Sequence, residues 1–375
     1  MISGKEIQEV IRRHRYSRPC IATLGSHSAL DICLGAKKEG LKTIVVCQKG
    51  REETYARFYK SDGKAGVVDE VIVLDRFADV VKDEVQEKLR RAQAVFVPHR
   101  SFEVYVGFDR IENDFLVPLF GNRALLRAEE RDAPRNQYFL LEKAGIRTPK
   151  RFASPKDIDR TVIVKVAEAK RTYERAFFFA HDLEDYTRES TQLIAKGVIT
   201  KEGLEKAVIE EVVCGAQCNF NFFHSPLTGR LELLGTDVRR QTNLDGVLRL
   251  PADEQLELLK RIRLTTIEAG HVAVTLRESL LESVLKMGEA FAKASKEEYP
   301  PGVIGPFALQ GALVPEEGRE EPVVFDVSLR MPGSPGTRFT PYSEYLHGES
   351  MSVGQRVARE IKQAARQGRI EKVVT

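Results

Sequence analysis

The sequence contains no tryptophan, and only five of its 375 residues are cysteines. Because an odd and small number of cysteines does not build a disulfide framework, we expect a protein of the reducing cytoplasm. Long apolar runs are missing too. No stretch approaches the roughly 18 residues of a transmembrane helix, and the arginine-rich first twenty residues lack the apolar core of a secretory signal. The sequence therefore predicts a cytoplasmic protein with no membrane partner.

An excess of charge of one sign is also missing. The chain has 58 Lys and Arg residues against 55 Asp and Glu residues, a formal net charge of +3. Nucleic-acid-binding proteins normally carry a basic surplus, so this balance argues against nucleic acid as a partner. What is present, 42% hydrophobic and 30% charged residues, is the composition of a folded protein, and the length predicts two or three domains.

In the first third of the chain, short runs of β-branched residues alternate with amphipathic segments. The runs predict strands at residues 20–24, 43–47, 71–74 and 94–98, and the segments between them predict helices at residues 29–39 and 76–93. Strands that alternate with helices at this spacing form a parallel sheet, and ligands bind at the carboxyl ends of such strands. We therefore expect an α/β domain over residues 1–122.

Beyond Asn122 the pattern changes to longer strands and longer helices. Strands are expected at residues 162–166, 209–213, 219–223, 230–234, 307–314 and 323–329. Helices are expected twice within residues 123–145 and at residues 253–268, 279–298 and 353–366. Mostly antiparallel strands flanked by helices predict a second, α+β domain over residues 123–375.

Two loops of the first domain carry residues suited to binding a phosphate. Residues 25–28 (Gly-Ser-His-Ser) lie between the first strand and the helix after it, where unpaired N–H groups and the helix dipole attract anions. Residues 98–101 (Pro-His-Arg-Ser) follow the fourth strand and would face the same edge of the sheet. The alternatives are a serine N-cap beside an incidental histidine for the first loop, and a polar loop without function for the second.

Two strands of the second domain carry charged residues of similar interest. Lys165 lies within an apolar strand, and a buried ammonium group needs an anionic partner such as a carboxylate or a phosphate. A lysine that reaches solvent from an exposed strand face is the alternative. Asp326, Ser328 and Arg330 alternate along one face of another strand. Acid, hydroxyl and guanidinium suit Mg²⁺–phosphate chemistry, although a solvated, ion-paired strand face would show the same pattern.

Six short motifs together resemble one protein family. They are Thr23–Asp31, Val46–Arg51, Gly121–Arg123, Leu141–Ile146, Arg277–Leu281 and Gly305–Phe307. From about Cys20 to Leu346 the chain is similar to the archaeal formate-dependent synthetases that formylate aminoimidazole carboxamide ribonucleotide (AICAR) in purine (IMP) biosynthesis. The resemblance implies an α/β plus α+β fold, in which a pre-ATP-grasp parallel-sheet domain precedes a two-lobed ATP-grasp domain.

The resemblance also implies a reaction and its ligands. ATP and Mg²⁺ (or Mn²⁺) would be the cofactors, and AICAR and formate the small-molecule substrates. Formate would attack the γ-phosphate of ATP to give formyl phosphate, and the amino group of AICAR would then take the formyl group, which yields the formylated ribonucleotide FAICAR. Such chemistry depends on positioning and on cations that neutralise the transferring phosphoryl group. The sequence leaves a homo-oligomer open.

The family's motifs carry individual roles over to this sequence. For the substrate these residues are Gly25, Ser26, His27, Ser101 and His271. For ATP they are Lys165, Glu210, Glu211, Val213 and Gln241, with the adenine hinge near residues 209–214. For the metal they are Asp326 and Gln310, and for catalysis they are Lys165 and Arg330.

Several of these residues depart from the family's pattern. Gln310 and Gln241 stand where the family has acids, and Asp326 replaces a glutamate. His271 replaces an asparagine, Arg100 replaces a glycine, and the glycine-rich flap reads Ala-Lys-Arg-Thr at residues 169–172. Since Mg²⁺ prefers anionic oxygens, fewer carboxylates predict weaker metal binding. Two hypotheses follow: an active ATP- and formate-dependent ligase, or a divergent paralogue that binds a nucleotide or ribonucleotide without formylating it.

Overall fold

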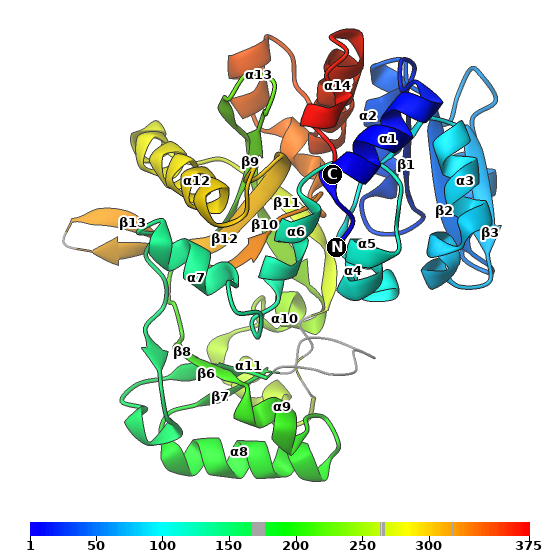
Figure 1. Cartoon of the computed structure of the whole chain (residues 1–375). Helices are drawn as coiled ribbons and strands as arrows, with labels where there is room; N and C mark the ends of the chain where they lie inside the picture. Colours follow the sequence, from blue (N-terminus) through cyan, green and yellow to red (C-terminus); the bar gives the residue numbers. More distant parts are fainter. Residues whose placement is uncertain (167–176, 263, 265–266, 317) are drawn as a thin grey trace.

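The computed structural model describes residues 1–166, 177–262, 264, 267–316 and 318–375, which form three sheets (Figure 1). The first sheet is parallel, in the order β3-β2-β1-β4; its strands are β1 (Cys20–Leu24), β2 (Thr43–Gln48), β3 (Glu70–Leu74) and β4 (Ala94–Phe96). The predicted parallel sheet is confirmed. Because β1 pairs with β2 on one side and β4 on the other, the strand order reverses between the carboxyl ends of β1 and β4, which is the usual ligand position.

Of the two helices predicted in this region, the one at residues 29–39 is confirmed and the other is partly wrong. The helix expected at residues 76–93 is wrong in its first half, because residues Phe77–Val81 form a 3₁₀ helix and Lys82 is extended. This break lets Phe77 and Val80 enter the core, and α3 (Asp83–Arg91) then begins anew with acidic residues in its first turn. The other helices here are the predicted α2 (Ala29–Lys38) and three that the sequence analysis did not predict, α1 (Gly4–His14), α4 (Arg100–Val106) and α5 (Phe108–Asn113).

The second sheet is antiparallel and has the order β11-β10-β9-β12-β13. Its strands are β9 (Ala216–His224), β10 (Leu231–Gln241), β11 (Glu268–Val274), β12 (Gly305–Glu316) and β13 (Arg319–Ser328). The predicted helix α12 (Glu278–Glu298) packs on this sheet, and its Val284 and Phe291 share a core with Phe222 and Phe307. The helix α7 (Gln137–Lys143) contacts α12. The short helix α6 (Arg123–Leu126) precedes α7 in the chain.

The helix expected at residues 253–268 is wrong in its second half. α11 (Ala252–Leu259) ends early, and β11 begins at Glu268 as the edge strand that pairs with β10. Pairing with a strand distant in the sequence decides the conformation here over local helix propensity. Together with α10 (Thr242–Val247), α11 therefore forms an excursion between two adjacent strands.

The third sheet is small and antiparallel, with the order β5-β8-β6-β7. Its strands are β5 (Arg151–Phe152), β6 (Val162–Lys165), β7 (Phe177–Ala180) and β8 (Val208–Glu211), and α8 (Leu183–Ala195) and α9 (Lys201–Glu205) lie beside it. The flap at residues 169–172 lies outside the described residues. The domain boundary after residue 122 stays a prediction. In the part of the chain that the structure describes, no helix is long and apolar enough to cross a membrane.

The C-terminal helix α14 (Val353–Arg366) lies at its predicted bounds and packs on α2 of the first sheet. The two helices cross so closely that a Cβ on Gly35 would lie 2.3 Å from the backbone of Gln355, so only glycine fits there. α13 (Tyr342–His347) precedes α14. The crossing helps to hold the segment after β13 against the first sheet, where Met331 forms a backbone bridge with His99.

Candidate active site

The loops after β1 and β4 meet at the carboxyl edge of the first sheet. Ser101 Oγ donates a hydrogen bond of 2.9 Å to Ser26 Oγ. His99 is fully buried behind them; its Nε2 lies 3.0 Å from the Leu24 carbonyl, and its Nδ1 accepts from the Ser101 N–H at 3.3 Å. Because a carbonyl can only accept, Nε2 carries the proton, and burial lowers the pKa of His99 to about 4. His99 is therefore a neutral support that fixes Ser101.

His27 lies in the loop after β1 in a left-handed conformation, with a φ of 48°. Ser28 Oγ donates to the Pro332 carbonyl at 2.6 Å and lies 2.6 Å from His27 Nδ1. Because the hydroxyl hydrogen goes to the carbonyl, Nδ1 carries the proton that binds Ser28, and Nε2 of the neutral ring is unprotonated. Withdrawal from water and the nearby charge of Arg330 hold the pKa of His27 well below its ordinary value, so the ring is neutral near pH 7.

A second histidine, His271 on β11, reaches the same place. A Cβ on Gly333 would lie 3.0 Å from His27 Nε2 and 3.3 Å from Glu268 Oε1, so this glycine separates the two side chains. Glu268 Oε1 is 3.0 Å from His271 Nε2, and His271 Nδ1 contacts Asp237. Burial opposes a charge on the ring, but the bonds to Asp237 and Glu268 outweigh it and raise the pKa of His271 to about 9. Both ring N–H groups of the resulting imidazolium face carboxylates, so the predicted role of His271 toward the substrate stays a prediction.

Lys165 ends β6 and forms an ion pair with Glu210 on the neighbouring β8. Its ammonium group also lies 3.2 Å from the Phe325 carbonyl, and Glu210 accepts a hydrogen bond of 3.1 Å from Tyr138. Burial lowers the pKa of Lys165, while Glu210 favours its charged form. Of the two interpretations left open by the sequence, the buried ammonium with a carboxylate partner is confirmed. Since Phe325 precedes Asp326, Lys165 reaches β13 next to the predicted metal ligand.

The structure gives the other residues predicted to bind ATP no contact with Lys165 or Asp326 among the described residues. The Glu211 carboxylate accepts from Arg160 and from the Lys150 N–H, both at 3.0 Å. Val213 follows the end of β8, and Gln241 ends β10 at a bulge. Lys165, paired with Glu210, therefore contacts β13, whereas the Glu211 carboxylate contacts Arg160 and Lys150. The roles of Glu211, Val213 and Gln241 in binding ATP stay predictions.

Adjacent positions of β12 and β13 carry the two predicted metal ligands, Gln310 and Asp326. Gln310 Oε1 accepts from Arg239 at 2.9 Å, and its Nε2 donates to Ser328 Oγ at 3.0 Å. Its oxygen therefore faces a cation. Asp326 supplies a carboxylate, with Arg131 at 3.6 Å. Because Mg²⁺ commonly binds through one carboxylate plus nucleotide phosphates, Asp326 fits as a contact, whereas Gln310 would first have to release Arg239.

A metal ion held by protein side chains alone is not favoured. Among the residues that the structure describes, no group of three His, Cys, Asp or Glu side chains is arranged to hold one. A divalent cation at Asp326 would therefore depend on oxygens that a nucleotide brings with it.

Arg330 belongs to a buried cluster of charges that the sequence pattern does not reveal. Its Nη1 donates to Ser328 Oγ at 2.9 Å, and its guanidinium lies 3.4 Å from Glu129 and 3.8 Å from Glu103. Arg100 pairs with the same two carboxylates, at 2.9 Å from Glu103 and 3.6 Å from Glu129. Burial and the neighbouring Glu129 raise the pKa of Glu103 to about 8. The one signal in the sequence was Arg100, which departs from the family's glycine.

We predict that Glu103→Gln removes a pH dependence of the protein's stability. Folding raises the pKa of Glu103 from 4.5 to about 8, so its contribution is complete below pH 4.5 and is lost as the pH rises toward 8. One proton accounts for at most about 1.4 kcal/mol per pH unit. Urea unfolding at a series of pH values should show this decline in the wild type and a flatter curve in the variant. An equal slope in both would mean that another group titrates.

Two side chains hold the free edge of β13. Among the described residues, β13 is the last strand of its sheet, so its outward N–H groups face no further strand there. Gln137 Oε1 accepts from the Val327 N–H at 2.7 Å, and Glu129 Oε1 accepts from the Leu329 N–H at 2.6 Å. Because side chains alternate along a strand, these two bonds fix the residues on either side of Val327 and Leu329 in their direction toward the site.

We predict that Gln137→Ala lowers the free energy of unfolding by about 1–3 kcal/mol, because it leaves the buried Val327 N–H without an acceptor. Gln192, exposed on α8, offers a matched control, and Gln192→Ala should change stability by less than about 0.5 kcal/mol. Chemical denaturation measures both variants. Equal costs for the two would show that Gln137 does not hold the strand.

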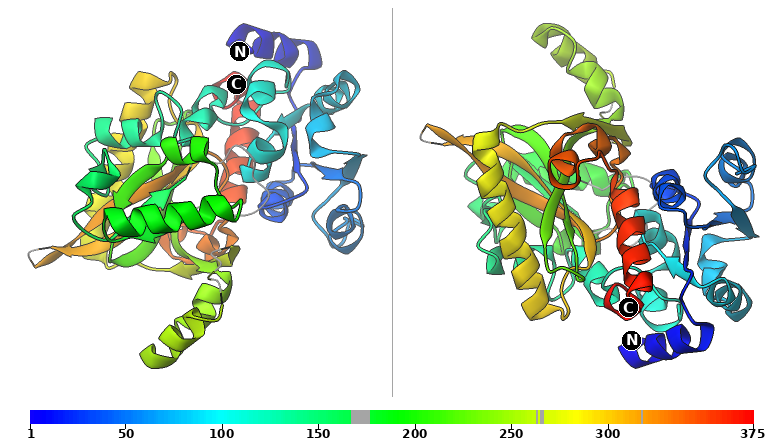
Figure 2. Two further views of the ribbon diagram at one scale, coloured as in Figure 1. Left: turned by 90° about the horizontal axis from the view of Figure 1, so that it is seen from below. Right: turned by 90° about the horizontal axis from the view of Figure 1, so that it is seen from above.

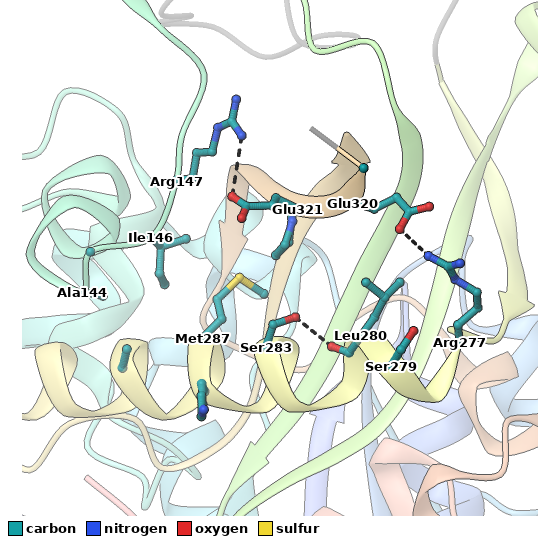
Figure 3. Close-up of a pocket in the computed structure, with 15 residues that line it drawn as sticks. Ala144, Ile146, Arg147, Arg277, Ser279, Leu280, Ser283, Met287, Glu320 and Glu321 are labelled. Atoms are coloured by element: carbon teal, nitrogen blue, oxygen red, sulfur yellow. Dashed lines mark hydrogen bonds and ion pairs between the residues drawn. The ribbon is translucent and has the colours of Figure 1, made fainter. Parts of the chain in front are cut away.

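A pocket of about 650 Å³ lies elsewhere, between α12, the residues after α7 and the β12–β13 hairpin (Figure 3). Its lining includes the apolar side chains of Ile146, Leu280 and Met287, and the ion pair between Arg277 and Glu320 lies at its edge. None of the predicted site residues lines it. The candidate active site therefore lies apart from this pocket, in side chains that come from all three sheets.

Known sequences match this chain from end to end. Residues 21–152 match a family described as a protein of unknown function (DUF1246), and residues 185–375 match a domain of unknown function (DUF1297). The chain is 44% identical, over 376 residues and 100% of both chains, to the 5-formaminoimidazole-4-carboxamide-1-(beta)-D-ribofuranosyl 5'-monophosphate synthetase of Methanopyrus kandleri. It is 42% identical, over 377 residues and again 100% of both chains, to the protein of that name from Methanocaldococcus jannaschii.

Solved structures agree with these matches. The crystal structure of an IMP biosynthesis protein PurP from Thermococcus kodakaraensis has a TM-score of 0.70 and 30% identity, and the match covers 95% of this chain and 100% of that chain. The ADP complex of an N5-carboxyaminoimidazole ribonucleotide synthetase has a TM-score of 0.57 at 10% identity, over 90% of this chain and 78% of the other, which shows the fold alone. The predicted fold class, a parallel sheet followed by the two sheets of an ATP-grasp fold, is confirmed.

Proposed function

This chain belongs to the family of the 5-formaminoimidazole-4-carboxamide ribonucleotide (FAICAR) synthetases, and we propose that it is an ATP-grasp ligase that formylates AICAR in IMP biosynthesis. The observation that carries the proposal is the 44% identity along the whole of both chains. The gathering of Lys165, Asp326 and Arg330 with two histidines in one region supports it, because the reaction needs cations for a phosphoryl group and polar contacts for a ribonucleotide.

The proposed reaction consumes ATP, formate and AICAR and releases ADP, phosphate and FAICAR. A formate oxygen attacks the γ-phosphorus, the bond to the β-γ bridging oxygen breaks, and ADP leaves with that electron pair. The amino nitrogen of AICAR then attacks the formyl carbon, phosphate leaves, and the nitrogen loses a proton. Both steps move negative charge onto phosphate oxygens, so fixed cations beside those oxygens lower the barriers.

In this proposal Lys165 contacts the ATP phosphates and Arg330 the transferring phosphoryl group. Asp326 holds Mg²⁺ together with the nucleotide, and the ion, when bound, supplies positive charge to the phosphates. Ser26, His27 and Ser101 bind AICAR from the first sheet. His271, charged at neutral pH because Asp237 and Glu268 raise its pKa to about 9, would bind an anionic group of the substrate from β11 by exchanging one of these carboxylates for it.

The test is an incubation of the protein with ATP, Mg²⁺, formate and AICAR, followed by chromatography of ADP and FAICAR. The expected result is formation of both in equal amounts, with no FAICAR formed when formate or AICAR is left out. Asp326→Asn is the matched inactive control. The absence of FAICAR under conditions where AICAR stabilises the protein would overturn the proposal.

The alternative is a divergent paralogue that binds a nucleotide or ribonucleotide without formylating it. The contact between Gln310 and Arg239 favours it, since a cation then faces an oxygen that was predicted to bind the metal. Thermal unfolding with ATP and AICAR added separately distinguishes the two, because any ligand of the folded state raises the midpoint. Stabilisation by both ligands without any turnover would establish the paralogue.

A further inference from the structure

The second sheet carries a row of polar residues on the face opposite α12. Figure 2 shows α12, drawn in yellow, along one face of this sheet, and Phe222 of β9 shares a core with that helix. Because side chains alternate along a strand, Asn219 of β9 points to the other face. There the register aligns one polar residue from each of four neighbouring strands. They are Asp326 on β13, Gln310 on β12, Asn219 on β9 and Asp237 on β10.

Both polar atoms of Gln310 in this row are already bound. Its Oε1 accepts a hydrogen bond of 2.9 Å from Arg239, whose side chain reaches it across β9, and its Nε2 donates to Ser328 Oγ at 3.0 Å. Turning the amide round would place its NH₂ group against the guanidinium, donor against donor, so Arg239 fixes the direction of the oxygen. A metal ion on that oxygen would be repelled by the guanidinium. Gln310 therefore does not fit as a metal ligand.

The carboxylate at the other end of the row is also bound. Asp237 accepts hydrogen bonds from Asn219 at 2.9 Å and from Asn221 at 2.6 Å, and it contacts His271. These donors satisfy the buried carboxylate from within the sheet. Because Mg²⁺ prefers anionic oxygens, a divalent cation over this row would depend on Asp326 and on the phosphates of a nucleotide.

The guanidinium of Arg239 supplies a positive charge beside Gln310. Its Nε is buried and lies 3.3 Å from Glu268 Oε2, and it makes no hydrogen bond to the residues that the structure describes. The side chain as a whole is 26% exposed, so part of it is open to a ligand. Because a guanidinium presents several N–H groups in a planar fork, Arg239 can bind phosphate oxygens while it holds Gln310.

We propose that this chain holds one divalent cation with ATP, at Asp326, and that Arg239 provides the positive charge on the Gln310 side of the phosphates. A guanidinium fixed by the fold then faces the γ-phosphate oxygens, where stabilisation of negative charge lowers the barrier to transfer. The inference rests on the proposed ATP site, but it does not depend on formate or AICAR.

Electron paramagnetic resonance of Mn²⁺, used in place of Mg²⁺, tests the proposal without turnover. The full chain is titrated with Mn²⁺ in the presence of an equimolar amount of the non-hydrolysable β,γ-imido analogue of ATP. The wild type is expected to bind one Mn²⁺ and to give the spectrum of an isolated ion. Gln310→Glu with Arg239→Gln replaces the guanidinium by a second carboxylate. It is expected to bind two ions about 4 Å apart, whose spins couple.

Single substitutions test the role of Arg239 itself. Arg239→Gln is expected to weaken binding of the analogue at least roughly tenfold, since a charge-assisted contact with phosphate is lost. Arg240→Gln is the matched control at the next position. Arg240 is 52% exposed and pairs with Asp245, so its loss should change neither the affinity nor the number of ions. Thermal unfolding checks that all variants are folded.

The outcomes separate this inference from the proposed function. Two Mn²⁺ ions in the wild type would overturn the inference and leave the ligase in place. An unchanged affinity of Arg239→Gln for the analogue, or a double variant that still binds one ion, would overturn it as well. A wild type that does not bind the analogue would instead remove the proposed ATP site, and this inference with it.

Discussion

Replacing Lys165 by methionine is expected to lower kcat/KM for FAICAR formation by roughly 10²–10³-fold. Methionine keeps an unbranched side chain of similar length but removes the ammonium group that we propose contacts the ATP phosphates. Initial rates of ADP and FAICAR formation measure the effect. A variant with wild-type rates would remove Lys165 from the proposed ATP site.

The same substitution should also destabilise the protein by about 3–5 kcal/mol, because it leaves the Glu210 carboxylate, 2% exposed, without its cation. Adding Glu210→Gln removes the unpaired charge, so the double variant should recover stability while it stays inactive. Lys150→Met is the matched control: its ion pair with Asp159 is about half exposed and is worth about 0–1 kcal/mol. Recovery of activity in the double variant would contradict a direct role for Lys165.

Much of the fold could be predicted because hydrophobic periodicity is a local property. The strand Cys20–Leu24 and the helix Val353–Arg366 have the predicted bounds, since each has a continuous hydrophobic pattern and Ser352 caps the helix. The predictions that were wrong concern segments whose conformation is set by residues distant in the sequence. Glu268–Val274 is a strand because β10 offers an edge to pair with, and the break at Lys82 follows from the burial of Phe77 in a core built by other elements.

Some contacts of the candidate site could likewise be predicted from the sequence, and others could not. The meeting of Ser26 with Ser101 could be anticipated, because the carboxyl ends of neighbouring parallel strands share one edge. The cluster of Glu103, Glu129 and Arg100 around Arg330 could not, because a glutamate on a short helix has the same pattern whether it faces solvent or a buried arginine. Only the fold brings those four side chains together.

Replacing Arg330 by glutamine is expected to lower kcat/KM by roughly 10²–10³-fold, since it removes the cation proposed to contact the transferring phosphoryl group. It also leaves Arg100 alone against two buried carboxylates, which raises the pKa of Glu103 above its value of about 8 and favours uptake of a proton. We therefore expect a loss of about 3–5 kcal/mol in stability, larger at high pH than at low pH.

A second substitution separates the two effects of losing Arg330. Arg330→Gln with Glu103→Gln leaves one cation for one carboxylate. Urea unfolding should therefore show stability recovered above about pH 8, where Glu103 would otherwise ionise, and a weaker pH dependence, while initial rates of FAICAR formation stay low. Arg230→Gln, in the exposed turn before β10, is the matched control and should change neither quantity. If the double variant regained activity with its stability, Arg330 would serve the fold by neutralising Glu103, and the cation for the phosphoryl group would have to come from another residue of the site, such as Arg239 beside Gln310.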